Sequence, residues 1–363
     1  MKTNLLLALK ALGQHIWLDN LSRSLLRDGE LKSLMDNDGV DGVTSNPAIF
    51  QKAIAGSPYY REDLARMREA GMDAEACYEA LIIPDIQAAC DILWPAYVAS
   101  VGETGYVSLE VSPALAHDTV GTEAAALRLR QAVNRDNLLI KVPGTPAGVL
   151  AFENLTALGV KVNVTLIFSL DQYEAVAQAY LRGARRLLDN YGNATQLRSL
   201  ASVFLSRVDA LVDSRLDTIG TPIAKVLRGR SGVALAKRCY RRYLELFHGP
   251  SFATLADAGV RPQTPLWAST GSKNPAYSDV LYVDSLIGPE TINTLPDATL
   301  AAFRAHGTAL DLLGDGMDKA HFHIVALAGQ GIDLNAVGED LQRDGVRLFV
   351  EAYQAILGDM VKA

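Results

Sequence analysis

The stretch Leu138-Leu139-Ile140-Lys141-Val142-Pro143-Gly144-Thr145 places one lysine within a run of apolar residues that is typical of a buried β-strand. Burial removes water from the ammonium group, so such a lysine must find an anionic partner or lose its charge. A neutral amine is a nucleophile that can condense with a carbonyl group to form a Schiff base. Lys141 is therefore a candidate catalytic residue. As an alternative, a lysine near the end of a strand can reach water or pair with a carboxylate.

The residues after this strand predict a helix and then a second strand-helix unit. Thr145 is suited to cap a helix that begins at Pro146 and ends before Gly159, with three leucines buried along it: Leu150, Leu155 and Leu158. The next apolar run, residues 162–168, is followed by Ser169, which begins a capping-box pattern. Apolar residues then recur at helical spacing until Gly192. A repeating unit of strand, loop and helix follows.

Eight short runs of apolar or β-branched residues recur along the chain, with helical patterns between them. Most of the runs are continuously apolar, which is typical of parallel strands covered by helices. The pattern favours a (β/α)8 TIM barrel as a single domain over residues 1–363, with a helical tail from about residue 297 that packs outside the barrel. An open doubly wound sheet is the alternative, but the sequence has no glycine-rich phosphate loop. The predicted strands are 15–19, 42–45, 106–111, 138–142, 162–168, 200–205, 265–270 and 281–287.

Composition excludes several classes of partner. The chain has 363 residues, of which 49% are hydrophobic and 21% are charged, so it can bury a large core. Its net charge of −7 gives no electrostatic footprint for nucleic acid. The three cysteines have no metal-binding spacing and fit a reducing compartment, and no apolar run is long enough to cross a membrane. We therefore expect a cytoplasmic protein that binds neither nucleic acid nor membranes.

Polar residues cluster where the predicted strands end, which is where a barrel of this kind carries its functional groups. Glu110 lies between apolar residues, and a carboxylate in that position rarely lacks a partner or a role. Asn163 and Thr165 are two residues apart in one strand and so point to the same face. Asn46 precedes a proline and is equally typical of a helix N-cap. The candidate set is Asp19, Thr44, Asn46, Glu110, Lys141, Asn163, Thr165, Ser202, Arg207 and Ser269 to Lys273.

Six motifs of this chain resemble those of the transaldolase family, and more closely its bacterial branch that can occur fused to glucose-6-phosphate isomerase. The family comprises class I Schiff-base enzymes of the pentose phosphate pathway. The resemblance implies reversible transfer of a dihydroxyacetone unit from a ketose phosphate (sedoheptulose 7-phosphate or fructose 6-phosphate) to an aldose phosphate (glyceraldehyde 3-phosphate or erythrose 4-phosphate). The motifs span about residues 10 to 300 and are Asp41 to Phe50, Val107 to Val111, Ile140 to Pro143, Val162 to Phe168, Trp267 to Gly271 and Tyr282 to Thr291.

The resemblance also implies a role for each candidate. Lys141 forms the imine, Asp19 takes the hydroxyl proton that triggers cleavage, and Glu110 with Thr165 manages the water of imine formation. The dihydroxyacetone unit is held by Asn46 and Asn163. We expect neither a metal nor an organic cofactor, and a monomer or a homodimer.

Phosphate binding is the part of the resemblance that departs from the family's pattern. The family uses a serine and an arginine after the sixth strand and an arginine after the seventh. Ser202 and Arg207 match the first pair, but the basic residue after Ser269 is Lys273, which binds phosphate as a point charge without a bidentate fork. The complete predicted substrate-binding set is Thr44, Asn46, Asn163, Ser202, Phe204, Arg207, Ser269 and Lys273.

Three other functions remain open from the sequence. A fructose-6-phosphate aldolase shares the barrel and the lysine, but that branch has glutamine in place of Glu110 and tyrosine in place of Phe204. A non-catalytic sugar-phosphate binder would not need Lys141, Asp19 and Glu110 together. A metal-dependent aldolase would need the His321/His323 pair, which lies in a helical pattern where two residues apart face different ways. The chain ends at Ala363 soon after a helical pattern, so we expect no fused isomerase.

Overall fold

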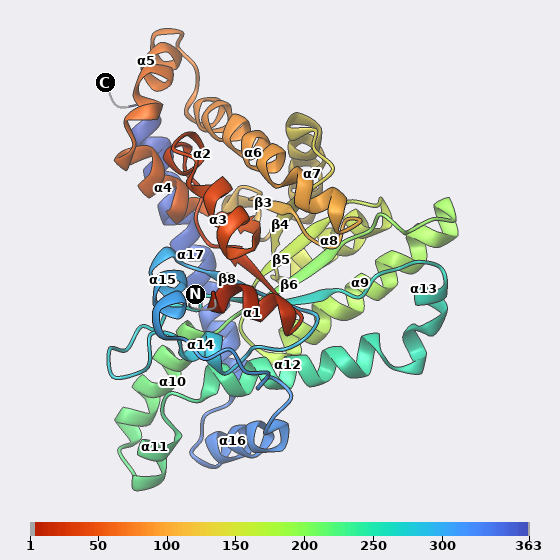
Figure 1. Ribbon diagram of the computed structural model, residues 1–363, viewed down its shortest axis with the longest axis vertical. Helices are drawn as coiled ribbons and strands as arrows, with labels where there is room; N and C mark the ends of the chain where they lie inside the picture. The colour runs from red at the N-terminus through yellow and green to blue at the C-terminus, as the bar shows by residue number, and fades with distance from the viewer. Residues whose placement is uncertain (1–3, 362–363) are drawn as a thin grey trace.

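In the computed structural model, which describes residues 4–361, eight parallel strands close into a barrel in chain order (Figure 1). The predicted (β/α)8 architecture is confirmed. The strands are β1 (Gln14–Leu18), β2 (Val40–Thr44), β3 (Tyr106–Glu110), β4 (Leu138–Pro143), β5 (Val162–Ile167), β6 (Ser199–Phe204), β7 (Thr264–Ala268) and β8 (Thr291–Leu295). Each lies within two residues of its prediction except the last.

The prediction of the eighth strand is wrong. Its apolar residues begin a short helix, α14 (Leu281–Asp284), and the strand itself follows ten residues later as β8. The strand β8 contains polar residues, so it was not recognised as an apolar run. Their side chains form hydrogen bonds in the core: Asn293 donates to the main-chain oxygen of Tyr282, and Thr291 donates to that of Gly288. Because these hydrogen bonds satisfy the buried polar groups, a polar sequence can form a core strand here.

Helices surround the barrel on all sides (Figure 1). In chain order they are α1 (Leu5–Ala11), α2 (Arg23–Arg27), α3 (Glu30–Asp38), α4 (Pro47–Gly56), η1 (Pro58–Tyr60), α5 (Arg61–Glu69), α6 (Ala74–Ala99), η2 (Pro113–Leu115), α7 (Thr119–Val133), α8 (Pro146–Ala157), α9 (Leu170–Tyr191), α10 (Ser206–Ile219), α11 (Pro222–Leu227), α12 (Ser231–Phe247), η3 (Pro250–Phe252), α13 (Ala253–Asp257), α14, α15 (Asp297–His306), α16 (Met317–Gly329) and α17 (Leu334–Val361).

The predicted helix starts after β4 and β5 are confirmed. The Thr145 hydroxyl accepts from the main-chain nitrogen of Gly148, and the Ser169 hydroxyl accepts from that of Gln172. The predicted burial of the leucines in α8 is only partly right. Leu155 is buried, but Leu150 is 57% exposed and Leu158 is 47% exposed. The buried stripe of α8 instead runs through smaller and aromatic residues, Gly148, Ala151 and Phe152, and then Leu155.

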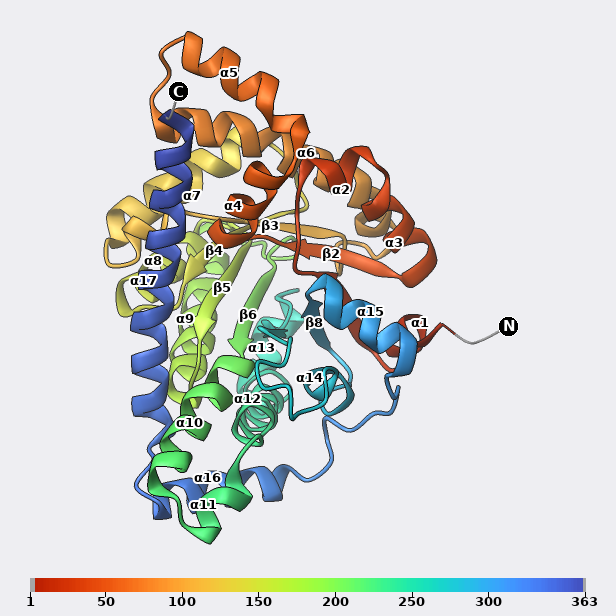
Figure 2. The ribbon, with the colours of Figure 1, turned by 90° about the vertical axis from the view of Figure 1, so that its left-hand side faces the viewer.

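The tail is helical as predicted, and its last helix reaches the functional end of the barrel. Figure 2 shows α17 running along the whole length of the molecule, next to α4. The amide of Gln342 donates to the main-chain oxygens of Gly144 and Leu166, which lie just after β4 and within β5. The tail therefore packs outside the strands, as expected, while α17 also fixes the segments around their carboxyl ends.

Among the described residues, one helix is long and apolar enough to cross a membrane when judged by length and composition alone, namely α6. This helix carries Asp85 and two internal prolines, and one of its faces packs against the barrel. The Asp85 carboxylate is buried and accepts hydrogen bonds from Arg23 and Tyr60. The packing identifies α6 as part of the outer layer of the barrel.

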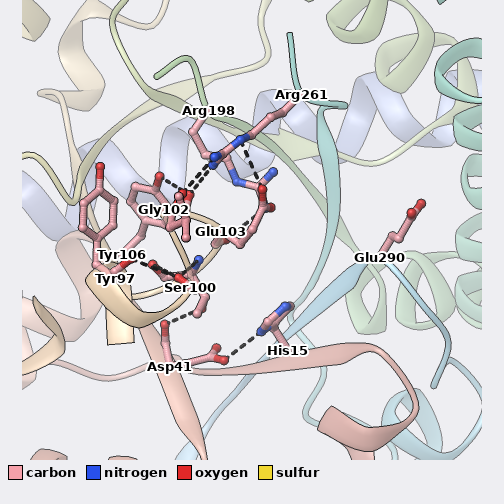
Figure 3. Close-up of polar contacts among 12 residues, drawn as sticks. His15, Asp41, Tyr97, Ser100, Gly102, Glu103, Tyr106, Arg198, Arg261 and Glu290 are labelled. Carbon is pink, nitrogen blue, oxygen red and sulfur yellow. Dashed lines mark hydrogen bonds and ion pairs between the residues drawn. The ribbon is translucent and has the colours of Figure 1, made fainter. Parts of the chain in front are cut away.

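Polar contacts also hold the opposite, N-terminal end of the barrel (Figure 3). The Asp41 carboxylate, at the start of β2, lies 2.7 Å from the His15 ring nitrogen and 3.0 Å from the Lys10 ammonium. Arg261 donates to the main-chain oxygen of Gly102, and Arg198 to that of Glu103. Because catalytic groups of TIM barrels lie at the other end, we interpret these contacts as structural.

Candidate active site

A cavity of about 270 Å³ opens at the carboxyl ends of the strands. It is lined by all the predicted site residues except Glu110 and Asn163, which lie next to it. The remaining lining comes from α4, α17, β7, β8 and the loops after these two strands. The cavity wall includes Asp19, Thr44, Asn46, Lys52, Lys141, Thr165, Ser202, Phe204, Arg207, Ser269, Lys273, Thr294 and Phe349.

Lys141 lies in the cavity wall and is held by two neighbours. Strand register pairs it with Glu110 on one side and Asn163 on the other. The side chain is 5% exposed, its Nζ donates to the main-chain oxygen of Ser45 at 3.1 Å, and the Glu110 carboxylate lies 3.5 Å away. The buried lysine therefore has an anionic partner and also faces the space where a ligand would lie.

Glu110 is the titratable carboxyl group beside this lysine. Burial raises the pKa of its carboxyl to about 7, and the nearby Lys141 opposes that rise. A carboxyl with a pKa near neutrality can both donate and accept a proton under physiological conditions. Glu110 is thus suited to protonate an oxygen that leaves from the Lys141 nitrogen and later to activate water.

A second carboxylate, Asp19, follows β1 and is fixed by a relay of hydroxyl groups. The Thr44 hydroxyl donates to Asp19 at 2.7 Å and lies 2.7 Å from the Thr294 hydroxyl. Since Thr44 has one hydroxyl hydrogen and gives it to Asp19, Thr294 must be the donor in the second bond. Burial raises the pKa of Asp19, and the charge of Lys141 and the bond from Thr44 oppose this. Thr294 was not predicted, because it lies in β8, which starts ten residues after the predicted eighth strand.

Asn163 lies beneath the cavity and uses both ends of its amide. Its NH2 group donates to the Ser108 hydroxyl at 3.1 Å, and its oxygen accepts from the Ser202 hydroxyl at 2.7 Å. Ser202 reaches the cavity wall, so Asn163 orients it from below. The neighbouring Thr165 hydroxyl is buried and has no hydrogen-bond partner within residues 4–361, which leaves it available for a ligand or a water molecule.

Asn46 occupies a position that is compatible with both of its predicted roles, helix capping and ligand binding. Its side-chain oxygen accepts from the main-chain nitrogen of Ile49 at 3.1 Å and caps α4. The residue also lines the cavity, and its NH2 group has no hydrogen-bond partner among the residues that the structure describes. Capping therefore occupies the acceptor of this side chain and leaves the donor for a ligand.

Three further cations surround the cavity without a carboxylate partner. Within residues 4–361, neither Arg207, Lys273 nor Lys52 forms an ion pair. Arg207 is half-buried, its guanidinium lies 5.8 Å from the centre of the Phe204 ring, and burial lowers its pKa. Lys273 and Lys52 are exposed. Unpaired cations around a cavity attract an anionic ligand such as a phosphate group. Lys52 was not predicted, because it comes from a helix and not from a strand end.

The histidine pair that suggested a metal site lies elsewhere, on α16. His321 is exposed, whereas the His323 ring faces α12 and lies 3.1 Å from the Ser231 hydroxyl. Burial lowers the pKa of His323 to about 4. In the part of the chain that the structure describes, no group of three or more His, Cys, Asp or Glu residues is arranged to hold a metal ion.

Comparison with known proteins identifies the family of this chain. The sequence profile of the family described as "Transaldolase/Fructose-6-phosphate aldolase" matches residues 16–360. The chain belongs to this transaldolase/fructose-6-phosphate aldolase family. It is 55% identical to a protein named "Transaldolase" from Thiobacillus denitrificans, over 96% of this chain and 97% of the relative. Proteins of the same name from Neisseria gonorrhoeae and Frankia alni are 45% and 44% identical, over 97% and 99% of this chain and 98% and 97% of the relatives.

In this chain, strand register places Lys141 next to Glu110 on one neighbouring strand and next to Asn163 on the other. The expected site is therefore contiguous in the fold, although its residues are spread over most of the sequence.

Proposed function

We propose that this chain is a transaldolase that moves a dihydroxyacetone unit from a ketose phosphate to an aldose phosphate through a Schiff base on Lys141. One observation carries the proposal: the Lys141 amine and the Glu110 carboxylate lie 3.5 Å apart beside a cavity ringed by unpaired cations. The relatives named "Transaldolase", which match almost the whole chain, support the same activity.

Imine formation is the first step. The Lys141 nitrogen attacks the carbonyl carbon of the ketose, and the carbonyl oxygen leaves as water. Glu110 supplies the proton that makes this oxygen a leaving group, which its raised pKa permits near neutral pH. The Thr165 hydroxyl, which has no partner in the part of the chain that the structure describes, can hold the departing oxygen.

Cleavage is the second step. Asp19 takes the proton of the hydroxyl next to the bond that breaks, and the aldose phosphate leaves with its new carbonyl group. The electrons of the broken bond enter the protonated imine on Lys141 and are stabilised there as an enamine. Addition of the enamine to a second aldose phosphate and hydrolysis of the imine complete the transfer.

Substrate binding follows from the other residues of the cavity. The NH2 group of Asn46 and the hydroxyl groups of Thr44 and Ser202 are suited to the hydroxyl groups of the dihydroxyacetone unit. Arg207 and Lys273 are suited to the phosphate, Arg207 with its planar fork and Lys273 as a point charge. The Ser269 hydroxyl forms a hydrogen bond with the Ser206 hydroxyl and helps to fix the loop that carries Lys273. The chain needs no cofactor for this chemistry.

Aldolase activity, in which dihydroxyacetone is released, is the second candidate. Release requires that water or an acid reaches the enamine before the acceptor does. Phe204 packs on Phe168 with ring centres 5.1 Å apart and presents an apolar wall to the cavity. This wall favours transfer over release, as does the carboxyl group of Glu110.

The remaining expectations fit this proposal. We propose one domain for residues 1–363, a cytoplasmic location, and a monomer or a homodimer. The three cysteines, Cys77, Cys90 and Cys239, are free and buried, which suits a reducing compartment.

The test is to incubate the protein with fructose 6-phosphate, reduce it with borohydride, and map the adduct by peptide mass spectrometry. A dihydroxyacetone adduct on the Lys141 peptide that decreases when an aldose phosphate is added would support a transaldolase. No adduct on that peptide would reject the mechanism. An adduct that is unaffected by the acceptor, together with free dihydroxyacetone, would favour the aldolase.

A further inference from the structure

A second, smaller cavity of about 40 Å³ lies beside Glu110, between β3, α6, α7 and α17. Its volume is sufficient for one water molecule. Glu110 lines this cavity, whereas Lys141 lines the substrate cavity, and the two residues form the ion pair described above. The reacting nitrogen is therefore separated from the small cavity by one carboxyl group.

Two polar side chains line the inner end of the small cavity. One is Glu110, whose buried Oε2 atom faces Lys141 at 3.5 Å and has no hydrogen-bond partner among the described residues. The Tyr78 hydroxyl also has no hydrogen-bond partner among the described residues, although the tyrosine is only 7% exposed. Buried polar groups without protein partners are commonly satisfied by ordered water. The inner end is thus suited to a water molecule held between the carboxyl group and the phenol.

The outer end of the same cavity reaches the protein surface. There, Arg128 forms a two-pronged ion pair with Glu79 at 2.5 and 2.7 Å, and the Arg128 side chain is 54% exposed. Tyr353 of α17 donates to Glu75 at 3.0 Å. The lining therefore runs from the buried side chain of Glu110, which is 5% exposed, to charged side chains in contact with solvent.

Imine chemistry needs a place for one water molecule. The step forms a bond from the Lys141 nitrogen to the carbonyl carbon and breaks the bond from that carbon to oxygen. The oxygen leaves as water, and its two hydrogens come from the amine by way of Glu110, which ends the step as it began. Hydrolysis reverses each change. During both steps the sugar phosphate occupies the substrate cavity, so a separate cavity beside Glu110 offers the water a place outside it.

We propose that the cavity lined by Glu110 and Tyr78 receives the water that imine formation releases, returns it for hydrolysis, and exchanges it with solvent between α6 and α7. This inference rests on the proposed function, because it assigns a path to the water of the Lys141 imine. It makes Tyr78 a positioning residue, which holds the water molecule and does not touch the sugar.

The test measures oxygen exchange in ¹⁸O-labelled water. Each cycle of imine formation and hydrolysis replaces the carbonyl oxygen of fructose 6-phosphate with solvent oxygen, provided that the released water escapes before it returns. Ala125→Leu on α7 fills the cavity, since Ala125 lines it. The control is Ala124→Leu, because Ala124 is the exposed neighbour on the same helix and does not line the cavity.

We expect Ala125→Leu to slow oxygen exchange at least about fivefold, whereas Ala124→Leu leaves the rate at the wild-type value. The amount of imine trapped by borohydride at equilibrium should be the same in both variants, because a water path changes rates and not the equilibrium. Equal exchange rates in Ala125→Leu, Ala124→Leu and wild type would overturn the inference.

If Ala125→Leu distorts the site and reduces the amount of trapped imine, a second variant provides the test. Tyr78→Phe removes one oxygen and adds no volume, and we expect it to slow exchange about threefold to fivefold, the effect of one lost hydrogen bond. An unchanged exchange rate in Tyr78→Phe would then overturn the inference. If the wild-type protein traps no imine at Lys141, the proposed function fails instead.

Discussion

The Nζ atom of Lys141 lies 3.5 Å from the Oε2 atom of Glu110, and both side chains are 5% exposed. The pair forms because β3 and β4 are in register at these two residues. Each group limits the cost of burying the other, and neither is fully satisfied by hydrogen bonds. The pair therefore stays available for proton transfer to and from a bound carbonyl group.

The first prediction concerns the nucleophile. Lys141→Arg should abolish transfer and leave no borohydride-trapped adduct, because arginine stays protonated and cannot form an imine. Transfer is measured with fructose 6-phosphate and an aldose phosphate. The control is Lys319→Arg, which makes the same exchange outside the cavity, and it should keep full activity. Retained activity in Lys141→Arg would refute the mechanism.

The second prediction concerns the pH dependence of stability. The folded-state pKa of Glu110 is about 7, above the ordinary value of 4.5. Between these values the folded state binds more protons than the unfolded state, so the free energy of unfolding falls as pH rises and levels off above about pH 7. The fall from this group should be on the order of 3 kcal/mol.

Urea unfolding at pH 5 and pH 8 checks this sign. Glu110→Gln lacks the ionisation, so its stability relative to wild type should increase between the two pH values. A relative stability that is constant or that decreases with pH would mean that Lys141 outweighs burial in setting the charge of Glu110.

The site shows how far the sequence can be interpreted. Lys141 and Glu110 were predictable because a charged residue in an apolar strand is unusual and must have a partner. Thr294 was not predictable, since the sequence pattern does not show the buried hydrogen bonds that allow polar residues in β8. Lys52 and Phe349 reach the cavity from α4 and α17. Helical periodicity predicts which face of a helix is buried, but it does not predict which strand end that face meets.

The third prediction concerns Thr294, which acts on Asp19 only through Thr44. Thr294→Val removes the hydrogen bond to Thr44 and should lower kcat about tenfold with little change in KM, because Asp19 is less well positioned for cleavage. Thr294→Ser restores the hydroxyl group and should restore most of kcat. An equal loss in the serine and valine variants would assign Thr294 a packing role instead.

The fourth prediction concerns the phosphate. Arg207→Gln should raise KM for fructose 6-phosphate about tenfold or more, because it removes an unpaired cation and its fork. Turnover of unphosphorylated fructose at high concentration should change much less. Lys273→Arg retains the charge and should bind the phosphate at least as well as wild type. If Arg207→Gln impairs the reaction of fructose 6-phosphate and that of unphosphorylated fructose equally, Arg207 supports the cavity wall and does not bind phosphate.

The last prediction concerns the choice between transfer and release. Phe204 lines the cavity beside Arg207, and its ring carries no polar atom. Phe204→Tyr adds a hydroxyl group to this wall, where it can hold a water molecule that protonates the enamine on Lys141. We expect more dihydroxyacetone release relative to transfer, measured by quantifying both products from fructose 6-phosphate with a limiting acceptor. Phe349→Tyr adds the same group to the wall formed by α17 and serves as the matched control. An unchanged ratio in Phe204→Tyr, or an equal change in both variants, would show that the position of Phe204 does not control the outcome.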